Sequence, residues 1–232
     1  MSKNGHPKHI DNTEIIRNII DPIVAQATDE RPKTPLETDA HYAERLKKQL
    51  VQSLKHFQTR LQAAVKCLVD HHKWPKSVHR EKILDLWQDQ ETWNNEIAKG
   101  KVLQEMIHCT DHELEVIYTL GFTLYNQAKY EDAGNIFLFL TQLNPKVGAF
   151  WSALGTAEER LGELKDAANA YLLAAELEFD TLSPYLHAAK CLLKLGRAND
   201  AKKVLQVAID RSETESDLKK YQKDAEQMLQ GI

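Results

Sequence analysis

The sequence predicts an all-α protein whose second half repeats one helix–turn–helix unit three times. Small side chains recur every 34 residues, and so do the larger side chains that would pack against them. The recurring small positions are Gly121, Gly155 and Ala189, the alanines are Ala133, Ala167 and Ala201, and the large positions are Phe137, Tyr171 and Leu205. This period, with these small and aromatic positions, is the signature of tetratricopeptide repeats, in which each repeat is a pair of helices. Only nine glycines and seven prolines among 232 residues also favour a mostly helical chain.

Composition and charge exclude several classes of function. The net charge of −4 gives no basic surface that would indicate nucleic acid or an anionic membrane as a partner. No apolar run approaches the roughly 20 residues of a membrane-spanning helix, and residues 1–14 lack the apolar core of a secretory signal. Three widely spaced cysteines do not make a disulfide framework. We therefore expect a soluble, cytoplasmic protein.

Residues 1–38 are polar and contain prolines at 7, 22, 32 and 35. Residues 13–27 place isoleucines at helical spacing, although Pro22 interrupts this stripe. Residues 28–38 indicate a linker, because prolines and polar side chains cannot fill a core. We expect residues 1–38 to be a mobile segment unless the isoleucine stripe docks on another surface.

Residues 39–70 predict a long helix with one narrow apolar stripe opposite a polar face. Its apolar positions are Leu50, Leu54, Phe57, Leu61, Ala64 and Leu68. Such a stripe predicts a seam against another helix, which can lie in this chain or in a second copy. Pro75 ends the helix, since proline disfavours the α conformation of the residue before it.

Two shorter helical segments precede the repeats. Residues 77–98 predict a helix that Gly100 caps, and residues 101–108 predict a short helical turn. Thr110 and Glu113 form a capping box that opens the first helix of the repeats. Residues 39–110 together form an N-terminal helical region, and we regard it as a candidate dimerisation region.

The repeats are expected at 114–147, 148–181 and 182–215, and residues 216–232 are expected to form a capping helix. Each repeat has an aspartate before its alanine, in the first turn of the second helix, where the helix dipole favours a negative charge. Three repeats are about the minimum for an independently stable stack, whose end needs a polar cap.

No catalytic or cofactor motif is present in the sequence. Ten histidines invite a search for a metal site, but pairs such as Cys67/His71 and His108/His112 do not supply four ligands at zinc spacing. Glu158 and Glu159 are adjacent on a helix and point to different sides, so we expect a solvated face there instead of an acid–base pair. We expect no catalytic residues, no metal and no cofactor.

Three aromatic residues of the first repeat are not needed for packing between its helices. The first helices of such repeats line the concave surface of the stack. Their predicted binding residues are Tyr118, Phe122 and Tyr125 in repeat one, Ser152, Thr156 and Glu159 in repeat two, and Leu186, Lys190 and Leu193 in repeat three. Exposed aromatics are typical of interfaces, because each buries a large apolar area with few rotors to fix. The pattern predicts a groove for an extended peptide with a few apolar side chains; alternatively, the N-terminal helices fold back and cover these aromatics.

Several strings are more particular than the repeat itself. Residues 100–106 read GKVLQEM, residues 111–122 read DHELEVIYTLGF, residues 150–155 read FWSALG and residues 185–191 read YLHAAKC. Over about residues 93–215 these strings resemble the class II chaperones of bacterial type III secretion, the SycD/LcrH-like translocator chaperones.

The resemblance implies a cytoplasmic, non-enzymatic chaperone that holds an extended segment of a hydrophobic translocator subunit in its concave groove. Tyr118, Phe122 and Tyr125 match the family's aromatic groove positions. The family's helix before the repeats often mediates homodimers and corresponds here to residues 77–108, whereas residues 1–92 have no counterpart in its shorter members. The competing interpretation is a tetratricopeptide scaffold or regulatory adaptor that joins folded proteins.

Overall fold

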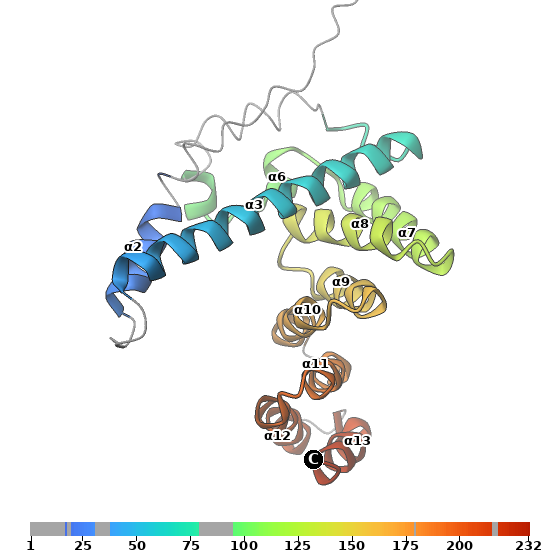
Figure 1. Cartoon of the computed structure of the whole chain (residues 1–232). Helices are drawn as coiled ribbons and strands as arrows, with labels where there is room; N and C mark the ends of the chain where they lie inside the picture. Colours follow the sequence, from blue (N-terminus) through green and yellow to red (C-terminus); the bar gives the residue numbers. More distant parts are fainter. Residues whose placement is uncertain (1–16, 18–19, 31–37, 79–94, 179, 215–217) are drawn as a thin grey trace, which may run out of the picture. The chain divides into compact units, whose positions relative to one another are not determined.

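The computed structural model describes residues 17, 20–30, 38–78, 95–178, 180–214 and 218–232. Every secondary-structure element among them is helical, which confirms the all-α prediction (Figure 1). The chain divides into two compact units, Met1–Thr59 and Arg60–Ile232, and helix α3 (Asp39–Asp70) contributes residues to both. The domain boundaries predicted at residues 38 and 110 stay predictions.

The first unit contains helix α2 (Asp21–Glu30) and the beginning of α3. Pro22 is the second residue of α2, and the interruption predicted there stays a prediction, because residues 18–19 lie outside the described residues. Because α2 continues to Glu30, the linker predicted from residue 28 is wrong over its first three residues, and residues 31–37 lie outside the described residues. Lys47 Nζ lies 2.6 Å from Asp21 Oδ1 and links the two helices.

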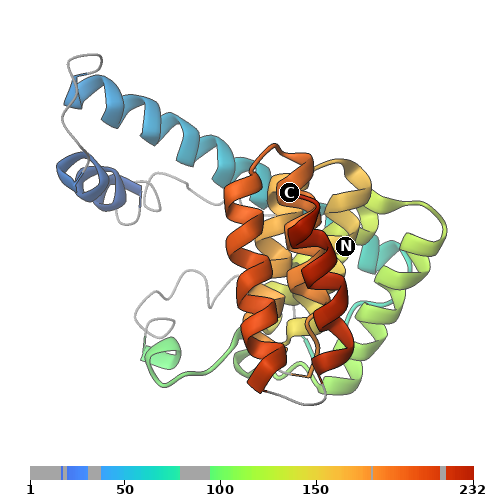
Figure 2. The ribbon, with the colours of Figure 1, turned by 90° about the horizontal axis from the view of Figure 1, so that it is seen from below.

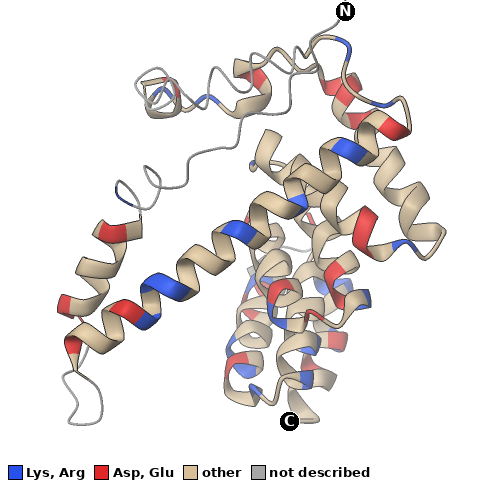
Figure 3. Ribbon diagram, turned by 45° about the horizontal axis from the view of Figure 1, so that its top comes forward, with Lys and Arg blue, Asp and Glu red and all other residues tan. Residues whose placement is uncertain are grey.

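Helix α3 has the bounds that the apolar stripe predicted. Lysine and arginine recur along its polar face (Figure 3). Leu61, Ala64 and Leu68 are buried in the second unit, so this part of the seam finds its partner within the chain. The seam residues of the first unit, Leu50, Leu54 and Phe57, are half-buried.

The segment between α3 and the repeats is only partly described. Most of the helix predicted over 77–98 lies outside the described residues. Gly100 adopts a φ of 80°, and the N–H of Lys101 donates to the Glu96 carbonyl, so Gly100 caps a helical end as predicted. The predicted turn over 101–108 contains the short helix α6 (Leu103–Met106), with Val102, Leu103 and Ile107 buried.

The capping box that opens the repeats is present. Thr110 Oγ1 accepts from the Glu113 N–H, and a Glu113 carboxylate oxygen accepts from the Thr110 N–H at 2.9 Å. The same carboxylate accepts from the N–H of Ser77 at 2.9 Å and from its hydroxyl. Burial opposes the charged form of Glu113, but the hydrogen bonds from Ser77 and Thr110 outweigh it and lower its pKa to about 2.

Three helical pairs follow the capping box, stacked one after another along the second unit (Figure 1). They are α7 (Asp111–Asn126) with α8 (Tyr130–Leu143), α9 (Gly148–Leu161) with α10 (Leu164–Leu177), and α11 (Ser183–Lys194) with α12 (Ala198–Thr214). The predicted repeat architecture is therefore confirmed.

Close approach between the two helices of a repeat explains the recurring small residues. A Cβ at Gly121 would lie 2.5 Å from Phe137 Cε1, and a Cβ at Gly155 would lie 2.9 Å from Tyr171 Cδ1. Phe137 and Tyr171 are buried by this contact. The aromatic ring thus fills the space that the missing side chain leaves, which fixes how far apart the two helices lie.

Helix α13 (Lys219–Gln230) covers the end of the array. It packs beside α12 and also contacts α11 (Figure 2). Leu218 and Ala225 are buried there, and Thr181 Oγ1 donates to the Tyr221 hydroxyl at 3.0 Å. The predicted capping helix is confirmed, although residues 216–217 lie outside the described residues.

Candidate functional site

The residues predicted to bind a partner lie on the first helices of the three repeats, α7, α9 and α11. Side-chain contacts join these helices into one surface. The rings of Tyr118 on α7 and Phe150 on α9 are 5.5 Å apart, and Lys194 Nζ on α11 lies 2.7 Å from Glu159 Oε1 on α9. We call the surface formed by α7, α9 and α11 the candidate binding face.

An aromatic cluster forms the first part of this face. The rings of Tyr118 and Phe122 meet edge to face at 4.8 Å, and both contact the buried ring of Phe137, at 5.9 and 5.4 Å. Phe122 is nevertheless 40% exposed, and Tyr118 is half-buried. The core thus holds the two rings in place while part of their apolar surface stays accessible. We call Tyr118 and Phe122 the aromatic pair.

Tyr125, the third predicted aromatic, has different neighbours. Its ring contacts Tyr130 on α8 at 5.1 Å. The guanidinium of Arg160 lies 4.8 Å from the centre of the Tyr130 ring and donates to its hydroxyl at 2.6 Å. Tyr125 therefore belongs to a second, more polar aromatic group, and the three aromatics do not form one patch.

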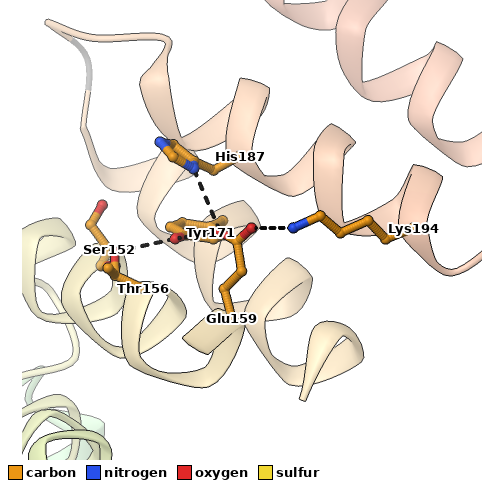
Figure 4. Close-up of polar contacts among 6 residues, drawn as sticks. All are labelled: Ser152, Thr156, Glu159, Tyr171, His187 and Lys194. Carbon is orange, nitrogen blue, oxygen red and sulfur yellow. Dashed lines mark hydrogen bonds and ion pairs between the residues drawn. The ribbon is translucent and has the colours of Figure 1, made fainter. Parts of the chain in front are cut away.

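The middle repeat contributes a polar network (Figure 4). Glu159 Oε1 accepts from Lys194 Nζ, and Glu159 Oε2 lies 3.8 Å from His187 Nδ1, which is too long for a hydrogen bond. The His187 ring stacks on Tyr171 with 5.0 Å between centroids. The Tyr171 hydroxyl lies 3.2 Å from Thr156 Oγ1 and 3.4 Å from Glu159 Oε2, so it can donate to either.

The charges of this network follow from burial and pairing. Burial opposes ionisation of Glu159, but the hydrogen bond and charge of Lys194 outweigh it, so the pKa of Glu159 is lowered. Burial, together with Lys190, lowers the pKa of His187. Burial raises the pKa of Tyr171 above its ordinary value. Near neutral pH the network holds one paired carboxylate, a neutral imidazole and a neutral phenol, which suits hydrogen bonding to a polypeptide.

A pocket of about 140 Å³ lies beside this network, between the second and third repeats. It is lined by Ser152, Thr156, Tyr171, Glu178, Ser183, Pro184 and His187. Ser152 Oγ donates to Glu178 Oε1 at 3.1 Å. Sequence reasoning assigned no binding role to Glu178, because it follows the second helix of its repeat. It assigned none to His187 either, although the residue belongs to the string over 185–191.

The third repeat agrees only partly with the prediction. Lys190 is exposed and Leu193 is half-buried, so both offer surface to a partner. Leu186 is only 7% exposed and belongs to the core that α11 shares with α10 and α12. Leu186 was predicted to line the accessible part of the groove, and the structure instead places it in the core.

The prediction of a solvated face at Glu158 and Glu159 is wrong. Glu158 is only 2% exposed, and its Oε1 lies 2.6 Å from Arg60 Nη2 in the second half of α3. Arg60 Nε also donates to Asn135 Oδ1 on α8 at 2.8 Å. Because adjacent helical residues point to different sides, Glu158 faces Arg60 while Glu159 faces Lys194.

The described residues contain neither a metal-binding cluster nor a helix suited to span a membrane. No group of three or more histidine, cysteine, aspartate or glutamate side chains is arranged to hold a metal ion there. Over the same residues, no helix combines the length and the apolar character that crossing a membrane requires.

No family model matches the chain. In sequence, the chain is 27% identical over 133 residues to the low calcium response locus protein H of Yersinia pestis. The aligned residues cover 57% of this chain and 79% of that protein. In structure, it resembles the type III secretion translocator chaperone SycD of Yersinia enterocolitica, with a TM-score of 0.51 and 26% identity over 57% of this chain and 98% of SycD. It also resembles a chain of a type III secretion complex from Aeromonas hydrophila, with a TM-score of 0.55 and 27% identity over 60% of this chain and 93% of that one. The predicted resemblance to the SycD/LcrH-like translocator chaperones of type III secretion is thereby confirmed over a little more than half of the chain.

Proposed function

We propose that this chain is a chaperone of a bacterial type III secretion system, which binds an extended segment of a hydrophobic translocator subunit on its candidate binding face. Its similarity to SycD, a translocator chaperone, supports this function. We further propose that it acts in the bacterial cytoplasm, before secretion, and that it catalyses no reaction.

The observation that carries the proposal is the aromatic pair. Phe122 exposes 40% of its surface although its ring rests on a buried phenylalanine, so its position is fixed before any partner arrives. A rigid, partly exposed apolar surface binds apolar side chains at a low entropic cost.

The physical need for such a chaperone is direct. A translocator subunit carries segments that favour a membrane, and in water these exposed apolar segments aggregate. Binding one segment in extended form masks part of that surface. Because the client must later be released, we expect a dissociation constant between micromolar and nanomolar, about 8–12 kcal/mol of binding free energy.

Co-expression with a translocator subunit of the same secretion system tests the proposal. We expect the wild-type chain to keep that subunit in the soluble fraction. The double variant Tyr118→Ala, Phe122→Ala should lose most of the bound subunit, since buried interface aromatics contribute about 2 kcal/mol or more each.

The matched control removes two exposed apolar side chains elsewhere. Leu173 on α10 and Val207 on α12 are 46% and 44% exposed, and neither belongs to the candidate binding face. Leu173→Ala with Val207→Ala should leave the complex unchanged. The proposed site is wrong if the translocator subunit stays bound to a folded Tyr118→Ala, Phe122→Ala variant.

A further inference from the structure

Glu178 differs from the shielded glutamates of the middle repeat, Glu158 and Glu159, in that no described cationic side chain pairs with it. Glu158 pairs with Arg60, and Glu159 pairs with Lys194. Glu178 is half-buried, and among the described residues no lysine, arginine or histidine forms an ion pair with it. Its carboxylate accepts one hydrogen bond, from Ser152. A nearby cation stabilises the ionised form of a shielded carboxylate. The described residues give Glu178 no such cation, so its negative charge is not compensated within them.

The histidine of the same pocket does not supply the missing charge. Burial and Lys190 lower the pKa of His187, so its ring is neutral near neutral pH, and the nearest acid to its Nδ1 is Glu159. The other residues that line the pocket are Pro184 and the hydroxyl-bearing Ser152, Thr156, Tyr171 and Ser183, none of which brings a charge.

The position of Glu178 depends on a glycine at the start of α9. A Cβ at Gly148 would lie 2.5 Å from Glu178 Cγ, so any other residue at 148 would displace the glutamate. The glycine therefore leaves room for the Glu178 side chain, which lines the pocket.

Glu178 also lies close to the aromatic pair. Ser152, which donates to Glu178 at 3.1 Å, and Phe150, whose ring lies 5.5 Å from that of Tyr118, are two residues apart at the start of α9. The pKa of Tyr118 is raised by burial first and then by the charge of Glu178, in agreement with this placement. An extended polypeptide advances about 3.3 Å per residue, so two of its side chains a few residues apart can reach both features.

We propose that the pocket of Glu178 receives a lysine or arginine side chain of the bound client segment, a few residues from the apolar side chain that contacts Tyr118 and Phe122. This inference rests on the proposed function and adds a chemical requirement to it. The pocket volume of about 140 Å³ equals that of roughly four to five water molecules, enough for the end of a long side chain. The client segment is then recognised by an apolar and a cationic residue together.

Binding of designed peptides to the full chain tests this inference. The probes are fluorescein-labelled peptides of serine and glycine that contain one leucine and one variable residue, placed one to four positions away on either side. The variable residue is lysine, norleucine or glutamate; norleucine keeps the aliphatic chain of lysine without its charge. Fluorescence anisotropy is measured for wild type, for Glu178→Gln, and for Glu163→Gln, which removes an exposed carboxylate outside the pocket.

We expect lysine to bind about tenfold more tightly than norleucine at the best spacing, the lower end of what a charge-assisted hydrogen bond contributes. Glu178→Gln keeps the shape of the side chain but should make the lysine and norleucine peptides bind equally tightly. Glu163→Gln should leave the tenfold preference for lysine unchanged. Far-UV circular dichroism and melting should match wild type in both variants.

The other outcomes separate the two proposals. If the peptides bind through leucine, and lose affinity in Tyr118→Ala, Phe122→Ala, but lysine and norleucine bind equally, the cationic subsite is wrong and the proposed function stands. Preference for glutamate at every spacing also refutes the subsite. Failure of the wild-type chain to bind any peptide at millimolar concentration contradicts both proposals.

Discussion

Replacing Arg60 with methionine should destabilise the second unit strongly. The substitution keeps most of the aliphatic stem but removes the guanidinium that contacts Glu158 Oε1 at 2.6 Å and Asn135 Oδ1 at 2.8 Å. Glu158 is 2% exposed and Asn135 is also buried, so neither gains access to water without rearrangement.

The magnitude follows from the loss of one member of a buried ion pair, which typically costs 3–5 kcal/mol. The Arg60 side chain is itself 17% exposed, so we expect the lower end, about 3 kcal/mol of unfolding free energy. For a chain of this length that loss corresponds to a melting temperature lower by roughly 6–12 °C. The control Lys66→Met changes an exposed lysine of the same helix and should alter stability by less than about 0.5 kcal/mol.

The pH dependence distinguishes this cause from a loss of packing. Burial raises the pKa of Glu158 above its usual 4.5, although Arg60 opposes that rise. A raised folded-state pKa means that protonation favours the folded form, and that this stability is lost as the pH rises through the folded pKa. Without Arg60 the pKa of Glu158 rises further, so the cost of Arg60→Met should be small near pH 4.5 and grow toward pH 7.

Urea unfolding of Arg60→Met, Glu158→Met and the double variant measures these effects. The double variant should be more stable than Arg60→Met alone, because an apolar pair leaves no buried charge. If Arg60→Met lowers the unfolding free energy by less than about 1 kcal/mol at pH 7, or by an amount that does not change with pH, the reasoning is refuted.

Two further substitutions test how the repeats are built. Gly121→Ala should cost about 1–3 kcal/mol in urea unfolding, because its Cβ would lie 2.5 Å from the buried Phe137 ring; an unchanged midpoint would show that the helices can move apart freely. Glu113→Ala should cost about 1 kcal/mol at pH 7 through loss of the cap. Because the folded-state pKa of Glu113 is lowered to about 2, its contribution is present above its unfolded pKa and is lost as the pH falls toward 2. Wild type and Glu113→Ala should therefore converge in stability at low pH, and a constant difference would contradict this account.

The sequence predicted the repeats well because local rules dominate there. The contact between a small residue and an aromatic one recurs at a fixed spacing, and the capping box of Thr110 and Glu113 involves residues three apart. The long helix α3 was equally clear from its apolar stripe.

The errors arise where distant segments meet. Nothing near Glu158 in the sequence shows that Arg60 reaches it, since Arg60 lies on the polar side of another helix. The repeat position of Leu186 usually lies on the accessible surface, but here its side chain is buried in the core between α10, α11 and α12. Glu178 escaped notice because the pocket is formed by the meeting of two repeats, whereas the repeat pattern describes each one alone.

Site-specific photo-crosslinking tests the central claim most directly. A photoreactive phenylalanine analogue is placed at Phe122 in one variant and at Leu173 in another, each co-expressed with the translocator subunit. Both positions are similarly exposed, but only the first lies on the candidate binding face. We predict that the position-122 variant crosslinks to one short segment of the translocator subunit and that the position-173 variant does not. Crosslinking at 173 with none at 122 would contradict the account.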